Sequence, residues 1–261
     1  MEPYFSRRLL LRSGLGGVTI GAVAIAAGCS GSTTTDATSE DETSSDPQAS
    51  ESDTAASSDG ARSTASTGSW ERVELSFVSA YVFVRSGQAT VVDTGTSGSE
   101  HDIEDVLASA GLDWGDVSDV ILTHSHEDHV GSAAAIAQAA PEAMFHAGVP
   151  DLPAIDVGRD VSGVRDGDTV AELSIIATPG HTPGHLCVHD VANGVLVTGD
   201  ALTGRGGRVG LPVRDFTADY EEALRSVDYL GSFDFATALF GHGAPVDSGA
   251  SAQVRALAAG G

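Results

Sequence analysis

The stretch Thr123-His124-Ser125-His126-Glu127-Asp128-His129 decides the fold of this chain. It follows directly on the apolar run Val120-Ile121-Leu122, which is typical of a short buried strand. Alternate residues of an extended chain point the same way, so His124, His126 and Asp128 can converge on one side. The sequence therefore predicts that three metal-binding side chains meet where this strand ends.

His129 breaks the alternation and requires a turn, which the nearby Gly131 permits. With it, four side chains able to bind a metal stand within six positions. A lone histidine is usually an ordinary packed or surface residue, but this density indicates a metal site. Imidazole and carboxylate ligands suit zinc, iron or manganese.

Three more blocks follow predicted strands in the same manner. They are Thr178-Pro179-Gly180-His181-Thr182-Pro183-Gly184-His185 after residues 173–177, Thr198-Gly199-Asp200 after 195–197, and Gly241-His242-Gly243 after 236–240. Each places a polar side chain in a glycine-lined loop, where the backbone can turn tightly. Together the four blocks offer six histidines and two aspartates, enough for two metals with positions open for water.

Strands and helices alternate elsewhere in the chain. Residues 81–84 and 89–92 predict paired strands around a Ser86-Gly87 turn, and 143–146 and 186–189 predict further strands. Ser99 with Asp102 predicts a capping box for a helix ending at Gly111, and residues 132–140 predict an alanine-rich helix before Pro141. Asp219 with Glu222 predicts the cap of a second amphipathic helix. Sheets covered by helices are expected.

With these motifs in order, the chain resembles the metallo-β-lactamase superfamily, in particular its glyoxalase II-like hydrolase branch, from about Val78 to Val246. The resemblance implies an α+β fold, a four-layer αββα sandwich with the site at the sheet edges. It implies that a first metal is held by His124, His126 and His181, a second by Asp128, His129 and His242, and that Asp200 bridges them. Asp93 would support the metal loop from behind, and His185 would be a buried histidine that is not a ligand.

The mechanism implied by these ligands is hydrolysis by a hydroxide shared between two divalent ions, with zinc expected and iron or manganese as alternatives. Asp128 is the candidate catalytic residue that handles the proton. The expected substrate is a small molecule with an ester, thioester, lactone or phosphoester bond. Two alternatives stay open: a mononuclear iron persulfide dioxygenase, and a surface module that has kept metals without turnover.

The first 28 residues predict an export signal. Ser6-Arg7-Arg8-Leu9-Leu10 resembles a twin-arginine signal, and the apolar residues 14–27 are too few for a spanning helix. Ala26-Ala27-Gly28-Cys29 resembles a lipobox, which implies cleavage before Cys29 and a lipid on its sulfur. Residues 29–69 then predict a disordered tether, because 20 of residues 30–69 are Ser or Thr and none is aromatic, Val, Ile or Leu. We therefore expect residues 70–261 to form the catalytic domain, lipid-anchored on the outer face of the cell membrane.

The charge of the chain excludes some partners. Its 261 residues include 13 basic and 37 acidic side chains, a net charge of −24, and no lysine. This surplus would repel a phosphate backbone, so nucleic acid is not an expected partner. Acidity with arginine in place of lysine resembles proteins adapted to concentrated salt. Oligomeric state is left open by the sequence.

A few residues match no motif. His101, His146 and His189 are predicted to be solvated or packed histidines, and Cys187 a buried inert thiol. The segment Gly204-Arg205-Gly206-Gly207-Arg208 is equally consistent with an anion contact and with a surface turn. Residues 202–212 are expected to shape the substrate pocket.

Overall fold

The computed structural model describes residues 68–260, so the predicted signal peptide, Cys29 and nearly all of the predicted tether lie outside the described residues. The first strand begins at Ser69, one residue before the predicted start of the domain. Within the part of the chain that is described, no helix is both long enough and apolar enough to cross a membrane.

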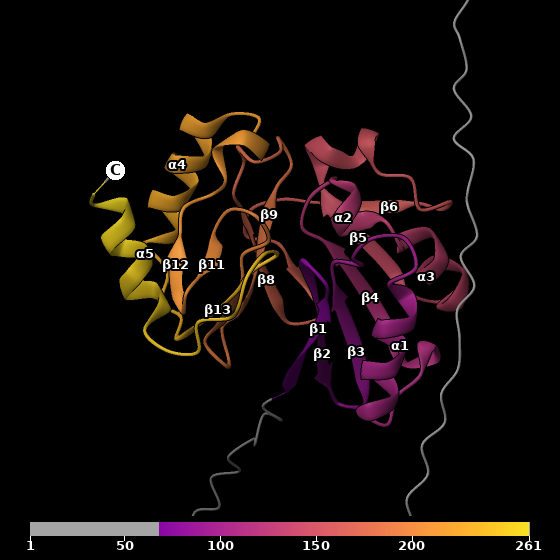
Figure 1. Ribbon diagram of the computed structural model, residues 1–261. Coiled ribbons are helices and arrows are strands. Elements are labelled where there is room, and N and C mark those ends of the chain that lie inside the picture. Colours follow the sequence, from indigo (N-terminus) through magenta and orange to yellow (C-terminus); the bar gives the residue numbers. More distant parts are fainter. Residues whose placement is uncertain (1–67, 261) are drawn as a thin grey trace, which may run out of the picture. The chain divides into compact units, whose positions relative to one another are not determined.

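Two sheets form the framework (Figure 1). The first contains, in spatial order, β1 (Ser69–Leu75), β2 (Val78–Arg85), β3 (Gln88–Val92), β4 (Val117–Leu122), β5 (Met144–Gly148) and β6 (Val161–Val164). The second contains β13 (Thr237–Leu239), β10 (Val195–Val197), β9 (Leu186–Asp190), β8 (Leu173–Ala177) and β7 (Thr169–Val170). A separate hairpin joins β11 (Thr203–Arg205) and β12 (Arg208–Gly210).

The first sheet is mixed. Its first three strands are antiparallel, whereas β3 to β6 run parallel. In the second sheet β7 to β10 are antiparallel and β13 adds parallel to β10. Because parallel neighbours end at the same edge, the loops after β4 and β5 leave one sheet together, and those after β10 and β13 leave the other.

Helices cover the outer face of each sheet, as Figure 1 shows. The helices α1 (Glu100–Ser109) and α3 (Ala133–Ala139) lie over the first sheet, and α4 (Tyr220–Leu230) and α5 (Ala250–Ala258) over the second. The short α2 (Glu127–Val130) belongs to a loop of the site. The described residues also form three 3₁₀ helices: η1 (Trp114–Asp116), η2 (Val149–Ala154) and η3 (Arg214–Phe216).

Three apolar clusters separate the four layers. One lies between the first sheet and its helices and includes Ile103 of α1 and Val120 of β4. Ile121, the next residue of β4, points the other way and packs in the cluster between the sheets. The third cluster joins the second sheet to its helices through Leu230 of α4. This is the predicted αββα sandwich, and the side-chain alternation along β4 is its direct physical basis.

Some local predictions need correction. Ser99 does precede α1, but its side chain makes no capping hydrogen bond to that helix, so the predicted capping box is wrong. The Ser99 amide instead donates to the hydroxyl of Ser132, which ties the helix start to the loop before α3. The Asp219 cap is confirmed, because its carboxylate accepts from the amide of Glu222.

Candidate metal centre

The site forms where four loops leave the two sheets. The first follows β4 and carries four of the predicted ligands, and the others follow β8, β10 and β13 and carry one each. The seven side chains fall into three overlapping groups whose ligand atoms lie within 4.8 Å of one another: His124, His126 and His181; His124, His129 and Asp200; Asp128, His129 and His242. All seven predicted ligands therefore converge.

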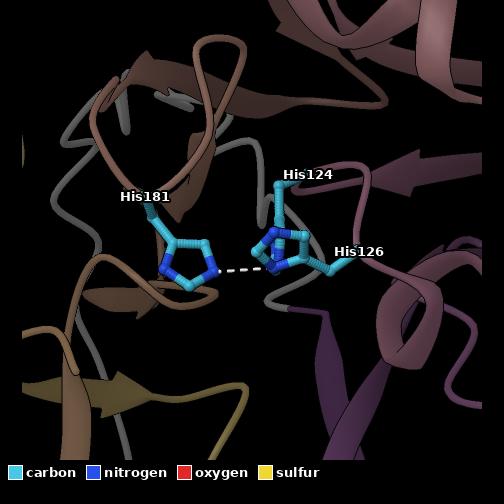
Figure 2. A group of neighbouring side chains, drawn as sticks. All are labelled: His124, His126 and His181. Carbon is cyan, nitrogen blue, oxygen red and sulfur yellow. Dashed lines mark hydrogen bonds between the residues drawn. The ribbon is translucent and has the colours of Figure 1, made fainter. Parts of the chain in front are cut away.

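The first group combines side chains from loops of both sheets. His124 and His126 come from the β4 loop and His181 from the loop after β8, and Figure 2 shows the three rings pointing toward one another. The Nε2 atom of His181 lies 3.0 Å from Nδ1 of His126. The ring centroids of these three histidines are 4.7 Å apart pairwise. Three nitrogen donors thus surround one point.

Asp200 lies between the first group and the third, which contains Asp128, His129 and His242. Its Oδ2 atom is 3.4 Å from Nε2 of His181 and 3.3 Å from Nε2 of His242. Its Oδ1 atom is 3.4 Å from Nε2 of His129. A single carboxylate therefore faces histidines of both groups, the arrangement that a bridging ligand requires.

Several buried polar atoms at this point have no hydrogen-bond partner. Among the described residues these include Nε2 of His124, Nε2 of His129 and Oδ1 of Asp200. Leaving such an atom unsatisfied typically costs about 1–3 kcal/mol, so their grouping demands an explanation. A divalent cation coordinated by imidazole nitrogen and carboxylate oxygen would satisfy them. The residues present therefore fit a metal ion.

The electrostatics of the site favour positive charge between the ligands. Burial, together with His129, keeps the pKa of His124 well below its usual value, and burial lowers the pKa of His181 to about 4. Burial also opposes charge on His129, but Asp93 and Asp200 outweigh it and raise its pKa to about 10. The carboxylates of Asp128 and Asp200 likewise raise the pKa of His242 to about 10. These carboxylates stabilise a cation here, whether a proton or a metal carries the charge.

Asp93 holds the β4 loop from behind. Its backbone has a φ of 61°, in the left-handed region, which turns the carboxylate back under the loop. Oδ1 accepts from the amide of Thr123 at 2.7 Å, and Oδ2 accepts from Nδ1 of His129 at 2.8 Å. Since Nδ1 of His129 carries the donated hydrogen, Nε2 is left to face the cluster. Asp93 therefore lies where the resemblance implied.

His185 is buried and contacts Asp200 through the backbone. Its Nε2 accepts from the amide of Asp200 at 3.0 Å, and its Nδ1 pairs with the hydroxyl of Thr178 at 2.8 Å. Both ring nitrogens are thus occupied, so the ring positions the Asp200 loop and has no nitrogen left for a metal. Gly199, with a φ of 47°, has no room for a Cβ beside this ring and Thr123.

Asp151 is a residue that the sequence motifs missed. It lies in η2, is 2% exposed, and belongs to no block of metal-binding residues. Its carboxylate accepts from the amide of Ser125, the hydroxyl of Thr182 and the amide of Gly184. It therefore joins the β4 loop to the His181 loop. Nothing in the local sequence Val149-Pro150-Asp151 signals this role.

A cavity of about 920 Å³ opens over the site. Residues of the cluster form its floor, and Phe77, Pro183 and residues 213–218 contribute to its walls, Arg214 excepted. The expectation that residues 202–212 shape the pocket is wrong, since none of them lines it. The predicted Gly204–Arg208 segment instead forms the turn of the β11–β12 hairpin, with Arg205 and Arg208 exposed.

The residues without a motif lie outside the cluster. His101 is exposed on α1, while His146 is buried and pairs with Oδ1 of Asp119 at 2.8 Å. His189 packs against the rings of Phe233 and Phe235. Cys187 is buried and free, and burial raises its pKa to about 12. These observations confirm the solvated or packed histidines and the burial of the thiol.

This fold and its His/Asp clusters define a class of protein. The family model of the metallo-beta-lactamase superfamily matches residues 73–242, and the chain belongs to that family. The fold of this family binds divalent metals, which agrees with the His/Asp clusters of the site. The sequences similar to this chain include hydrolases.

Relatives of known sequence support the glyoxalase II-like branch. The chain is 29% identical over 196 residues to an uncharacterized protein, YobT, of Bacillus subtilis (strain 168), a match covering 64% of this chain and 83% of that one. It is 30% identical over 140 residues to a hydroxyacylglutathione hydrolase of Methylobacillus flagellatus, covering 51% of each. The match thus spans about half the length of that hydrolase.

Solved structures show the same fold. A metallo-beta-lactamase family protein from Thermus thermophilus superposes with a TM-score of 0.58 at 23% identity, covering 74% of this chain and 78% of that one. A second structure, TTHA1623 in a di-iron-bound form, gives a TM-score of 0.57 at 24% identity, covering 68% of this chain and 93% of that one.

Proposed function

We propose that this protein is a hydrolase that binds two divalent metal ions and cleaves an ester, thioester, lactone or phosphoester in a small molecule. Zinc is the expected metal, and iron and manganese are the alternatives. The observation that carries the proposal is the place of Asp200, whose carboxylate lies 3.3–3.4 Å from Nε2 of His129, His181 and His242 at the floor of the cavity.

In this proposal His124, His126 and His181 would hold the first ion, Asp128, His129 and His242 would hold the second, and Asp200 would contribute to both sites. When bound, such cations polarise a carbonyl or phosphoryl oxygen and lower the pKa of a water molecule toward about 7. The buried contacts of Asp93, His185 and Asp151 hold the ligand loops in place, so that little reorganisation is needed on binding.

Asp128 is the proposed catalytic residue. Its carboxylate borders the cavity and lies 3.3 Å from Nε2 of His242, so it can take a proton from an attacking water and give that proton to the leaving group when the substrate bond breaks. Replacing it with asparagine keeps the shape but removes the base. An Asp128→Asn protein that retains both metals should lose most of its turnover, and full turnover would remove this role.

The test of the function is elemental analysis of the purified protein followed by a substrate panel. Two zinc ions per chain and hydrolysis of an ester or phosphodiester, both lost in His124→Ala, would support it. One iron per chain with sulfur-dependent oxygen uptake would support the dioxygenase alternative. Metals without hydrolysis of any panel member would support a module that has kept its ligands without turnover.

We further propose that the protein is exported and lipid-anchored through Cys29 on the outer face of the cell membrane. The support is the twin-arginine pattern and the lipobox of residues 1–29. Metabolic labelling with a radioactive fatty acid should mark the wild-type chain and not Cys29→Ser. Equal labelling of the two proteins would overturn the proposal.

A further inference from the structure

Two phenylalanines stand exposed on the walls of the cavity. Phe77 is 61% exposed and Phe216 is 71% exposed, and both line the space above the metal cluster. A single exposed apolar side chain is ordinary, but two on one cavity indicate a surface that an apolar ligand covers.

Phe77 is fixed relative to His242. It lies between β1 and β2, and its carbonyl oxygen accepts from Nδ1 of His242 at 2.8 Å. Its ring stacks on the imidazole, with centroids 6.1 Å apart and an interplanar angle of 4°. The position of this wall is therefore coupled to a candidate metal ligand.

Phe216 is fixed relative to His181. It ends η3, and the residues after it are bonded to the His181 loop: the amide of Ala218 donates to the carbonyl of His181 at 3.1 Å. The hydroxyl of Thr217 lies 3.4 Å from Nδ1 of His181. The two phenylalanines thus border the cluster next to different ligands, so a group bound between them would lie beside the reacting atoms.

The walls of the cavity carry acidic side chains. None of the described residues that line it is a lysine or arginine, and its basic groups are the three histidines of the cluster. Glu127 and Asp215 line it as exposed acids. The nearby Arg214 does not line the cavity, and its guanidinium lies over the ring of Tyr220 at 3.8 Å. The net charge of −24 adds a repulsive field for anions.

We infer that the substrate is an uncharged ester or lactone whose apolar group lies against Phe77 and Phe216, and that the cavity discriminates against substrates with an anionic distal group. The inference rests on the proposed hydrolytic function and narrows it. The reacting carbonyl would lie beside the residues that can hold metal ions, whereas the distal group meets walls whose described residues include acids and no arginine or lysine. Esters and thioesters whose distal group carries a carboxylate or phosphate are therefore poor substrates.

The test compares two esters that differ in one terminal group: 4-nitrophenyl hexanoate and the mono-4-nitrophenyl ester of adipic acid, in which a carboxylate replaces the terminal methyl. We expect kcat/KM of the zinc-loaded full chain to be at least about tenfold higher for the neutral ester at low salt. The double variant Glu127→Gln, Asp215→Asn should raise the ratio of kcat/KM for the anionic ester to that for the neutral ester. Glu142→Gln, an exposed acid that does not line the cavity, is the matched control. Equal or faster turnover of the anionic ester by the wild type would overturn the inference.

A second experiment tests whether Phe77 and Phe216 contact the apolar group of the substrate. Phe77→Ala and Phe216→Ala should each lower the ratio of kcat/KM for 4-nitrophenyl hexanoate to that for 4-nitrophenyl acetate by about tenfold, since each removes apolar area from the bound chain. Met144→Ala, which removes a 59% exposed side chain that does not line the cavity, should leave the ratio unchanged. An unchanged ratio in both phenylalanine variants would contradict the inference.

Failure of the inference and failure of the hydrolase proposal are separable. The amides N-(4-nitrophenyl)hexanamide and N-(4-nitrophenyl)adipamic acid probe binding by calorimetry without turnover. If no ester is cleaved and the neutral amide binds more tightly, the hydrolase proposal fails and the selectivity stands. If the anionic amide binds as tightly as the neutral one, or esters are cleaved without discrimination, the selectivity alone fails.

Discussion

The carboxylate of Asp151 accepts a hydrogen bond of 2.6 Å from the hydroxyl of Thr182, a residue 31 positions later in the chain. The same carboxylate accepts from the amides of Ser125 and Gly184, so one buried side chain links the loop that carries four predicted ligands to the loop that carries His181. The two loops leave different sheets, and Asp151 fixes their separation at the candidate metal centre.

Asp151→Asn should therefore weaken metal binding although Asp151 is no ligand. An amide group cannot accept at both oxygen positions, which leaves at least one buried N–H without an acceptor. We expect a loss of about 1–3 kcal/mol in the free energy of unfolding and a fall of about 10–100-fold in zinc affinity. Thermal unfolding and competitive zinc titration measure the two effects. Asp160→Asn, at an exposed position, is the control, and equal zinc affinity in both variants would contradict the role given to Asp151.

Removal of divalent metal should lower the melting temperature of the protein. A ligand that binds only the folded state at 100 times its Kd contributes about 2.7 kcal/mol, which corresponds to about 5–10 °C for a domain of this size. Calorimetric scans with EDTA and with added zinc measure the shift. His124→Ala should show much less of it, whereas His101→Ala, on the exposed face of α1, should match the wild type. A full shift in His124→Ala would mean that zinc binds elsewhere.

Gly241→Ala should disrupt the candidate metal centre although it replaces none of the proposed ligand residues. A Cβ at Gly241 would overlap Oδ1 of Asp200 and the ring of His129, and neither buried group has room to retreat. We expect a loss of bound metal and a fall in hydrolysis of at least about tenfold. Gly260→Ala is the control, because a Cβ there makes only ordinary contacts. Unchanged metal content and turnover in Gly241→Ala would show that the loops can move apart freely.

The thiol of Cys187 should be unreactive in the native protein. Burial raises its pKa to about 12, so at pH 8 only about one thiol in ten thousand is ionised, and the sulfur is also enclosed. In a Cys29→Ser background this is the single thiol of the chain. Ellman's reagent should detect no thiol until guanidinium unfolds the protein, and then one. Rapid reaction without denaturant would contradict the packing of β9.

Much of the fold was predictable because its signals are local. The β4 run with its following histidines and the Asp219 cap each need only neighbouring residues, and both appear as expected. The short strands β7, β11 and β12 were not predictable, since two or three residues are too few to display a period. The predicted capping box of α1 is absent, and the Ser99 amide instead donates to the hydroxyl of Ser132, which lies 33 positions away in the chain.

The sequence by itself determined which side chains can bind metal and that each follows a strand, because ligand type and strand periodicity are properties of neighbouring residues. Only the tertiary structure decided that Asp200 lies between two histidine groups, that Asp151 joins two loops, and that Phe77 and Phe216 border one cavity. Those relations depend on how two sheets stack and where their loops meet. Contacts between residues so far apart in the chain leave no mark on the local pattern of either one.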